Sequence, residues 1–328
     1  MKRMTVSSIL VAAVIASTAT SADTAYAQSS QAYPNRPIKL IVSFPPGGPL
    51  DVMGRLLAQQ LSARIGQVIV DNRPGAGGTL GGRAAATAEP DGYTLLLGSS
   101  AALAIGPALY KNIGYDPLKS FVPIALFSNV PYVMVAAMNA PYKSVPELLA
   151  YAKANPGTLN FGVPNGAPPH MLAEMFKMES KADIVVVPYK GAATAITDMI
   201  AGQIHGGFET ISVMFGHLHE GKVRGLAVVR EQRLPELPDV PTMTELGLPG
   251  VVGSSWSGLL VPVGTPQDIV DKLRAAMLAT LDSDEIKSTF KKLGAEARQT
   301  SPQQFAAFIA EEHDRIGAIV RATGAKSE

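Results

Sequence analysis

A short stretch near the start of the chain, residues 38–51, most constrains the fold. It begins as an apolar run rich in β-branched residues, Ile38–Val42, which is typical of a buried strand. It ends in Pro45-Pro46-Gly47-Gly48-Pro49, which neither a helix nor a strand interior tolerates. A helical pattern follows directly, and its apolar face consists of Val52, Met53, Leu56, Leu57 and Leu61. We therefore predict a strand, a tight turn and a helix, as in an α/β protein.

The glycine turn in this stretch is suited to an anion. A ligand can approach the backbone closely at Gly47 and Gly48, because neither residue has a Cβ. The helix that follows would add free N–H groups and the positive end of its dipole. The alternative is that the turn only connects a strand and a helix, as turns do in any α/β protein.

The first 27 residues have the pattern of a secretory signal peptide. Lys2 and Arg3 precede an apolar run, residues 9–16, that is too short to span a bilayer. Ala25-Tyr26-Ala27 fits the small-x-small cleavage rule, so we expect cleavage after Ala27 and export, most simply to a bacterial periplasm. The chain has no cysteine, which excludes a lipid-modified cysteine anchor and disulfides. No later segment resembles a transmembrane helix, so we expect no stable membrane insertion.

The charge balance excludes some partners. Removal of Lys2 and Arg3 from 28 basic residues, and of Asp23 from 27 acidic ones, leaves equal numbers of each. A neutral chain with 6% aromatic residues argues against nucleic acid or an anionic membrane as a partner. The remaining length suits two domains with ample cores.

Strands, glycine turns and helices alternate along the chain, which predicts parallel sheets whose turns gather at one edge. Residues 121–138 form a long extended segment that we interpret as a crossing into a second domain, and residues 223–229 should lead back. We predict a discontinuous first domain, residues 28–127 with 230–328, and a second domain, residues 128–229. Such an arrangement suggests a hinged clamshell with the ligand in the cleft.

Segments that resemble enzyme or metal-site motifs each lack a residue that the motif requires. Residues 216–222 have the spacing of a phosphate-binding loop, but Val223 replaces the Ser or Thr and a strand follows. Residues 75–80 resemble the dinucleotide-binding motif G-x-G-x-x-G, but Leu80 stands at the position of its third glycine. His217 and His219 lack further ligands for a closed metal site, and no nucleophile elbow occurs. We expect no catalysis, no cofactor and no metal.

Turns at strand ends remain as the candidate site, and most offer backbone N–H groups or small hydroxyls. This favours a carboxylate held without a salt bridge. Asp51 either holds water or a ligand amine or interacts with first-turn N–H groups. His170 either donates to a carboxylate or packs at a helix start. Glu209 either accepts a hydrogen bond from an amine or hydroxyl of the ligand, or forms an ion pair with a lysine. Trp256 is expected in the core rather than as a surface on which a ligand stacks.

At these same turns the sequence resembles the periplasmic solute-binding receptors of tripartite tricarboxylate transporters, the TctC-like Bug family. The resemblance covers nearly the whole mature chain. The segments that carry it are residues 33–38, 44–51, 71–78, 155–157, 187–191, 237–242 and 255–260.

The resemblance implies an α/β, two-domain type II periplasmic-binding-protein (Venus flytrap) fold, each domain an open, mostly parallel sheet flanked by helices. It also implies capture of a small organic acid and its delivery to the membrane permease subunits of such a transporter, without catalysis. We expect the receptor to be a monomer. The ligand-binding positions implied on one side of the cleft are Pro46, Gly47, Gly48, Asp51, Ser99 and Ser100. On the other side they are Asn165, Gly166, Ala167, His170, Lys190, Gly191 and Glu209.

Several positions depart from the family pattern. Leu50 and Pro168 stand where Thr and Ser are common, Glu209 stands where Asp is usual, and residues 101–104 replace a more polar stretch. A less polar pocket favours a ligand with an apolar or aromatic body and at least one carboxylate, rather than citrate.

Two other functions stay open at this point. A sensor that passes ligand occupancy to a signalling partner would have the same cleft. An exported organic-acid enzyme would need a catalytic pair, for which Asp51, His170 and Glu209 are the only candidates.

Overall fold

A computed structural model of the protein describes residues 33–297 and 299–324. The chain divides into two units after Asn35, and everything below concerns the unit that begins at Arg36. The predicted signal peptide, residues 1–27, lies outside the described residues.

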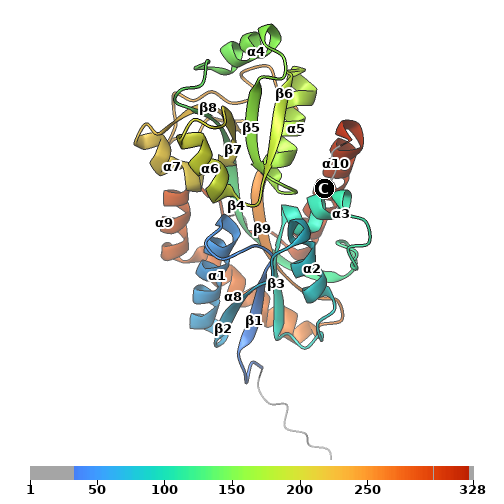
Figure 1. Ribbon diagram of the computed structural model, residues 1–328. Coiled ribbons are helices and arrows are strands. Elements are labelled where there is room, and N and C mark those ends of the chain that lie inside the picture. The colour runs from blue at the N-terminus through green and yellow to red at the C-terminus, as the bar shows by residue number, and fades with distance from the viewer. Residues whose placement is uncertain (1–32, 298, 325–328) are drawn as a thin grey trace, which may run out of the picture. The chain divides into compact units, whose positions relative to one another are not determined.

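In the part of the chain that the structure describes, nine β-strands form one mixed sheet in the order β2-β1-β3-β9-β4-β7-β5-β6, with β8 beside β4. Their bounds are β1 Ile38–Val42, β2 Val68–Asn72, β3 Thr94–Ser99, β4 Phe121–Ala137, β5 Leu159–Pro164, β6 Ile184–Tyr189, β7 Gly206–Thr210, β8 Val223–Val229 and β9 Ser254–Pro262. We call β2, β1, β3 and β9, with residues 121–131 of β4, the first half of the sheet. The second half comprises residues 132–137 of β4 with β7, β8, β5 and β6 (Figure 1).

Strand β4 joins the two halves. Up to Pro131 it pairs antiparallel with β9, and from Tyr132 onward it pairs with β7 and β8. The parallel pairs that the sequence predicts are present around β1 and β5. The pairs of β4 and β9 are antiparallel, because β4 leaves the first half of the sheet and β9 returns to it. The sheet is therefore mixed.

Helices cover both halves (Figure 1). Their bounds are α1 Pro49–Ile65, α2 Thr79–Ala86, α3 Gly106–Leu109, α4 Val145–Ala154, α5 Pro168–Ser180, α6 Ala192–Ile200, α7 Ile211–His219, α8 Gln267–Asp282, α9 Asp284–Leu293 and α10 Pro302–Thr323. A 3-10 turn at Ala76–Gly78 precedes α2, and a π-helical turn at Ala101–Ile105 precedes α3.

Helix α1 forms where the sequence predicts it. Gly48 is its N-cap and Pro49 its first residue, a position at which the missing N–H and fixed φ of proline are favourable. Met53, Leu57 and Leu61 are buried, as the apolar pattern predicts, but Val52 is 47% exposed. The prediction that Val52 shares the buried face is wrong, because that side chain lies beyond the stripe that packs on the sheet.

Each half has its own apolar cluster. In the first, Trp256 is buried and packs edge-on against Phe305 and Phe308, with ring centroids 6.2 and 5.2 Å apart. The prediction that Trp256 belongs to the core is thus confirmed. The second cluster contains Phe161 and also Val251, from the segment between β8 and β9. The residue boundaries that we predict for the two domains remain a prediction.

The packing around β9 generates a testable expectation. Gly258 pairs with Gly98 on β3, and an added Cβ there would overlap the ring of Phe305 and approach the backbone oxygen of Ala125. Gly258→Ala should lower the free energy of unfolding by about 1–3 kcal/mol, measured by chemical denaturation.

The matched control is Gly216→Ala on α7, where an added methyl meets open space. The control should leave stability unchanged or raise it by up to about 1 kcal/mol. Equal effects of the two substitutions would contradict the packing described for β9.

Candidate functional site

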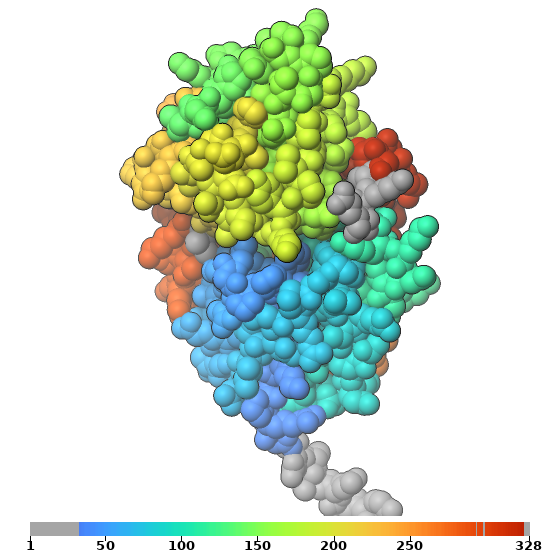
Figure 2. Space-filling model, in the orientation of Figure 1, coloured from blue at the N-terminus to red at the C-terminus, as the bar shows by residue number. Residues whose placement is uncertain are grey.

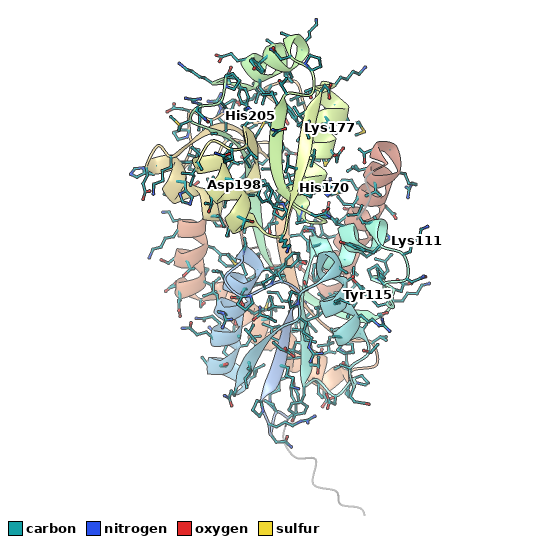
Figure 3. The ribbon with its side chains drawn as sticks, in the orientation of Figure 1. Lys111, Tyr115, His170, Lys177, Asp198 and His205 are labelled. Atoms are coloured by element: carbon teal, nitrogen blue, oxygen red, sulfur yellow. The ribbon has the colours of Figure 1, made fainter. Side chains whose placement is uncertain are left out.

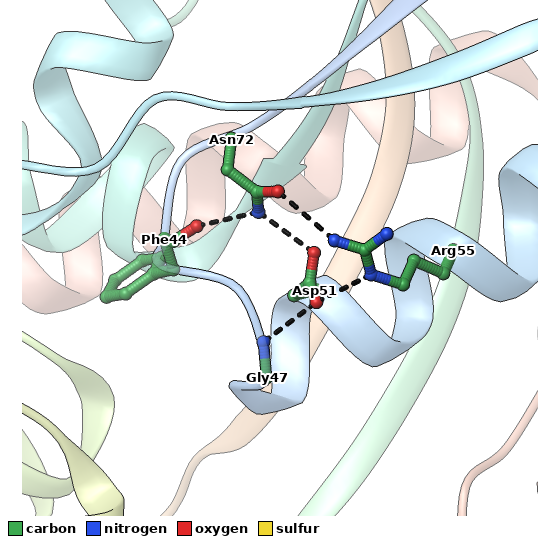
Figure 4. A network of polar contacts seen from close by, with 5 residues as sticks. All are labelled: Phe44, Gly47, Asp51, Arg55 and Asn72. Carbon is green, nitrogen blue, oxygen red and sulfur yellow. Dashed lines mark hydrogen bonds and ion pairs between the residues drawn. The ribbon is translucent and has the colours of Figure 1, made fainter.

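The turn between β1 and α1 is fixed by the carboxylate of Asp51 (Figure 4). Its Oδ2 accepts hydrogen bonds from the backbone N–H of Gly47 and from Nε of Arg55, both at 2.8 Å. Its Oδ1 accepts from Nδ2 of Asn72 at 2.9 Å, and Nδ2 also donates to the carbonyl oxygen of Phe44 at 3.0 Å. The Asp51 side chain is 2% exposed, so its oxygens are used within the protein.

The same contacts set the ionisation of Asp51. Burial alone would raise its pKa. The hydrogen bonds from Arg55, Gly47 and Asn72, together with the positive charge of Arg55, outweigh burial and hold the pKa of Asp51 below its ordinary value. The group is therefore a carboxylate at neutral pH.

A cleft lies where the ends of α1, β7 and α7 meet the paired strands β4 and β9. We call it the hydroxyl cleft. It is lined by Pro49, Leu50, Met53, Ser128, Val130, Thr210, Ser212, Ser255 and Ser257. The empty space around these residues is about 250 Å³ when the adjoining open solvent is counted. On the face drawn in Figure 2, the second half, in green to yellow, lies directly on the blue-to-cyan first half.

The strand register brings the serines of the hydroxyl cleft together. Ser128 is opposite Ser257 in the β4–β9 ladder, and Val130 is opposite Ser255. Side chains alternate along a strand, so these four point to one side while Trp256 points to the other, into the core. The hydroxyl oxygens of Ser128 and Ser257 are 2.7 Å apart and hydrogen-bonded.

Two helix N-termini face the hydroxyl cleft. Helix α1 begins at Pro49 and α7 at Ile211, directly after the lining residue Thr210. The first N–H groups of a helix have no partner within it, and the helix dipole makes this end positive. The described lining contains no Lys, Arg or His. The cleft therefore offers neutral donors to an anion.

Glu209 lies at the end of β7, beside the hydroxyl cleft. The side chain is 5% exposed, and Oε1 accepts hydrogen bonds from the backbone N–H of Thr210 at 2.7 Å and from its hydroxyl at 3.1 Å. Burial raises the pKa of Glu209 to about 7, although both Thr210 bonds oppose the rise. The structure shows no lysine partner among the described contacts of Glu209, so the simple ion-pair alternative is not what the side chain does here.

The turn after β5 reaches the first half of the sheet. Gly166 has a φ of +67°, and a Cβ there would lie 3.1 Å from the hydroxyl oxygen of Tyr110 and 3.6 Å from the Cα of Gly77. This turn, Asn165–Ala167, therefore closes against residues of the opposite half. It needs glycine both for its backbone conformation and for the close approach.

His170 is buried in the first turn of α5 (Figure 3). The sequence suggests His170 as the start of this helix, but α5 begins two residues earlier, because Pro168 and Pro169 both suit its first turn. Burial lowers the pKa of His170, although the carboxylate of Glu174 opposes the shift. Its Nδ1 accepts a long hydrogen bond, 3.4 Å, from the N–H of Gly166.

The other predicted residues lie around these features. Ser99 is opposite Ser257 in the β3–β9 ladder, and Ser100 is buried. Gly47 and Gly191 face open space, with no atom within 4 Å of an added Cβ. Pro46 and Lys190 are exposed, Gly48 is partly exposed and Ala167 is buried.

Sequence reasoning missed the lining of the hydroxyl cleft. It singled out turn residues, whereas the serines of β4 and β9 come from strand interiors. A signal was present: hydroxyl residues recur with period two in apolar strands, at Ser255 and Ser257. Such a pattern places them on one face.

Among the described residues, no group of three or more His, Cys, Asp or Glu side chains is placed to hold a metal ion. No helix in the part of the chain that the structure describes is long and apolar enough to span a bilayer.

The fold and the cleft together define a class, the two-domain α/β solute-binding proteins. Rpa4515 of R. palustris, solved with adipate, aligns with a TM-score of 0.84 and 33% identity over 89% of this chain and 98% of that one. MatC from Rhodopseudomonas palustris, solved with bound malate, aligns with a TM-score of 0.81 and 32% identity over 88% and 100%. The neighbours are substrate-binding proteins and not enzymes.

The chain belongs to the tripartite tricarboxylate transporter receptor family. The model described as "Tripartite tricarboxylate transporter family receptor" matches residues 53–325. Protein BugT of Bordetella pertussis is 40% identical over 301 residues, which are 91% of this chain and 92% of BugT. The predicted family, fold class and absence of enzymatic function are confirmed. Receptors of this family are periplasmic.

The role of Asp51 in fixing the first turn can be measured. Asp51→Ala removes the acceptor of three hydrogen bonds, from Gly47, Arg55 and Asn72, one of them charge-assisted. We expect the free energy of unfolding to fall by about 1–3 kcal/mol. The control is Asp71→Ala, which breaks a surface ion pair with Arg73 and should cost at most about 1 kcal/mol. Equal losses would show that the Asp51 contacts do not stabilise the turn.

The raised pKa of Glu209 predicts a pH effect. The folded protein holds this proton more tightly than the unfolded chain, whose glutamate has a pKa of 4.5. Stability should therefore fall as pH rises from about 4.5 to about 7 and then level off, by up to about 3 kcal/mol.

Glu209→Gln keeps an acceptor for Thr210 and should flatten this decline, seen in denaturation curves recorded across that pH range. Glu311→Gln, at an exposed position of α10, should leave it unchanged. A decline of the same size in Glu209→Gln as in the natural chain would contradict the assignment.

Proposed function

We propose that the chain is a periplasmic receptor that captures a small organic acid and delivers it to a tripartite tricarboxylate-type membrane permease. The observation that carries this proposal is the hydroxyl cleft, where the N-termini of α1 and α7 and a set of serines converge. Family membership supports the transport role.

A carboxylate fits the hydroxyl cleft better than other small anions. Neutral hydroxyl and amide donors bind a single, weakly basic charge without the desolvated cation that a strong salt bridge needs. A polyanion such as citrate would bring further charges into a cleft with no lining cation. The solved relatives with adipate and malate support a carboxylate ligand.

The predicted ligand-binding residues remain proposals at this stage. On the first half these are Pro46, Gly47, Gly48, Asp51, Ser99 and Ser100, and on the second half Asn165, Gly166, Ala167, His170, Lys190, Gly191 and Glu209. We propose that Asp51 acts through the turn that it fixes, because its oxygens are already occupied. Leu50 and Met53 in the cleft wall support a ligand with an apolar or aromatic body.

The location and assembly of the receptor complete the proposal. The chain would be exported, cleaved after Ala27 and released into the periplasm as a monomer. The transporter's membrane subunits would be its partners.

The first test is a thermal-shift screen of residues 28–328 against mono-, di- and tricarboxylates, aromatic acids and amino acids. An acid at about 100 times its dissociation constant should stabilise the fold by roughly 2.7 kcal/mol. We expect a selective shift with one acid class and recovery of the acid unchanged. A screen in which only tricarboxylic or polyhydroxylated acids bind would overturn the proposed ligand class.

A variant pair then tests the site. Ser212→Ala removes a hydroxyl of the cleft and should weaken acid binding about fivefold, or ~1 kcal/mol, in calorimetric titration. Ser288→Ala makes the same change at an exposed position of α9 and should leave affinity unchanged. Equal affinities of the two variants would place the carboxylate elsewhere.

A further inference from the structure

Glu209 already uses the hydrogen-bond donors at the start of α7. Thr210 is the N-cap residue of α7 and lines the hydroxyl cleft. Its backbone N–H and its hydroxyl both donate to Oε1 of Glu209, at 2.7 and 3.1 Å. Ser212, another lining residue, donates its hydroxyl to the hydroxyl oxygen of Thr210 at 3.2 Å. Two hydroxyls of the cleft therefore form a chain of donors that ends on a carboxylate of the protein itself.

Little else compensates the charge of Glu209. The side chain is buried, and its residue is opposite Val133 in the β4–β7 ladder. Both hydrogen bonds go to Oε1, and Oε2 has no hydrogen-bond partner among the residues that the structure describes. No Lys, Arg or His of the described chain is among the groups that act on this charge. A buried carboxyl without a cation favours its neutral form, so Oε2 is the atom that can hold a proton.

The titratable groups around Glu209 come from the neighbouring elements. They are Tyr132 on β4, His170, Glu174, Lys177 and Glu179 on α5, Asp198 on α6, His217 and His219 on α7 and, across the cleft, Asp51 and Arg55 on α1. Burial and the charge of Glu209 raise the pKa of Tyr132, so its hydroxyl stays neutral. Burial lowers the pKa of His170, which is thus neutral at pH 7 and above. His217 and His219 lie in the last turn of α7, away from the cleft.

A ligand carboxylate in the cleft would need the hydrogens that Glu209 uses. While Glu209 is ionised, Thr210 and Ser212 direct their hydroxyl hydrogens along the chain toward it and offer the ligand only lone pairs. The ligand and Glu209 would also be two negative charges in one site, which raises the pKa of one of the two carboxyl groups. Burial already raises the pKa of Glu209 to about 7, so Glu209 is the group that takes the proton.

We propose that Glu209 takes up one proton from solution when the acid binds, so that the occupied cleft holds the ligand as a carboxylate and Glu209 as a carboxylic acid. The hydroxyls of Thr210 and Ser212 are then free to turn toward the ligand, and Oε2–H is a further donor. This inference rests on the proposed carboxylate receptor and assigns Glu209 a role in it. It also disfavours a ligand ammonium group at this end of the cleft, because an ammonium would need Glu209 ionised.

Calorimetric titration of residues 28–328 from pH 6 to pH 9 measures this coupling. The probes are adipate, malate and benzoate, which are mainly ionised over this range. The acid with the largest shift in the thermal screen replaces them if none of the three binds. Binding should be about tenfold weaker at pH 8 than at pH 6, and about tenfold weaker again at pH 9, because the free receptor must first regain the proton that Glu209 has lost.

Proton uptake is measured independently of affinity. Titrations at one pH in phosphate and in Tris, whose heats of ionisation differ, give the number of protons bound with each acid. We expect close to one proton at pH 8. At pH 6 we expect close to none, because Glu209 is then already protonated in the free receptor.

Glu209→Gln replaces the titrating group by a neutral amide that keeps an acceptor for Thr210 and adds a donor. This variant should bind the acid at pH 8 as tightly as the natural chain does at pH 6, and it should take up no proton. Glu311→Gln is the matched control, because it removes a carboxylate at an exposed position of α10. The control should keep the pH dependence of the natural chain.

Thr210→Val tests the donor chain without changing Glu209. It removes the hydroxyl that donates to Oε1 and keeps the backbone N–H bond. Ionised Glu209 loses a charge-assisted donor, so the weakening of acid binding should begin at a pH about one unit higher. An unchanged onset would show that this hydroxyl does not control the proton on Glu209.

The outcomes separate the two proposals. If acids bind equally at all these pH values, if no proton is taken up at pH 8, or if Glu209→Gln keeps the decline, the proton inference is wrong while the carboxylate receptor stands. Affinity that rises with pH would also overturn it, since ionised Glu209 would then bind the ligand. If no carboxylate of any class binds the natural chain at any pH, both proposals are overturned. Thermal melts show that each variant is folded before affinities are compared.

Discussion

The antiparallel pairing of β4 with β9 is the contact on which the rest of the structure depends. It runs from Phe121 to Pro131 on one strand and from Ser254 to Pro262 on the other. The pairing joins the two halves of the sheet and sends Trp256 into the first core. It also directs Ser255 and Ser257 to the opposite face, so the same ladder that holds the protein together forms the floor of the hydroxyl cleft.

The charged side chains near this floor are already bound to groups of the protein. Asp51 is ionised and fully used by Arg55, Asn72 and the first turn, and the pair of Glu312 and Arg315 is closed on itself. Neither leaves a free charge for a ligand. What remains for an anion is a set of neutral dipoles: helix N-termini, amides and hydroxyls. Neutral donors bind a carboxylate with moderate strength, which suits a receptor that must also release its ligand.

Much of this architecture could be predicted from the sequence, because turns and apolar runs are local signals. The strand–turn–helix at residues 38–65 and the long strand β4 follow from proline, glycine and β-branched residues. Two features could not be predicted. The start of α5 before His170 depends on two prolines in its first turn. The serine floor depends on the register between β4 and β9, whose residues Ser128 and Ser257 are 129 positions apart in the sequence. Pairing over such distances leaves no local signature.

The position of β9 has a consequence for the order in which the protein can be assembled. During synthesis β3 and β4 appear first, but the strand that fits between them is Ser254–Pro262, far nearer the end of the chain. Until that segment is available, both strands have open edges and the cleft has no floor. Sheets closed by such distant segments form slowly. Ligand recognition is therefore among the last properties that the growing chain acquires, and any product truncated before Ser254 lacks it altogether.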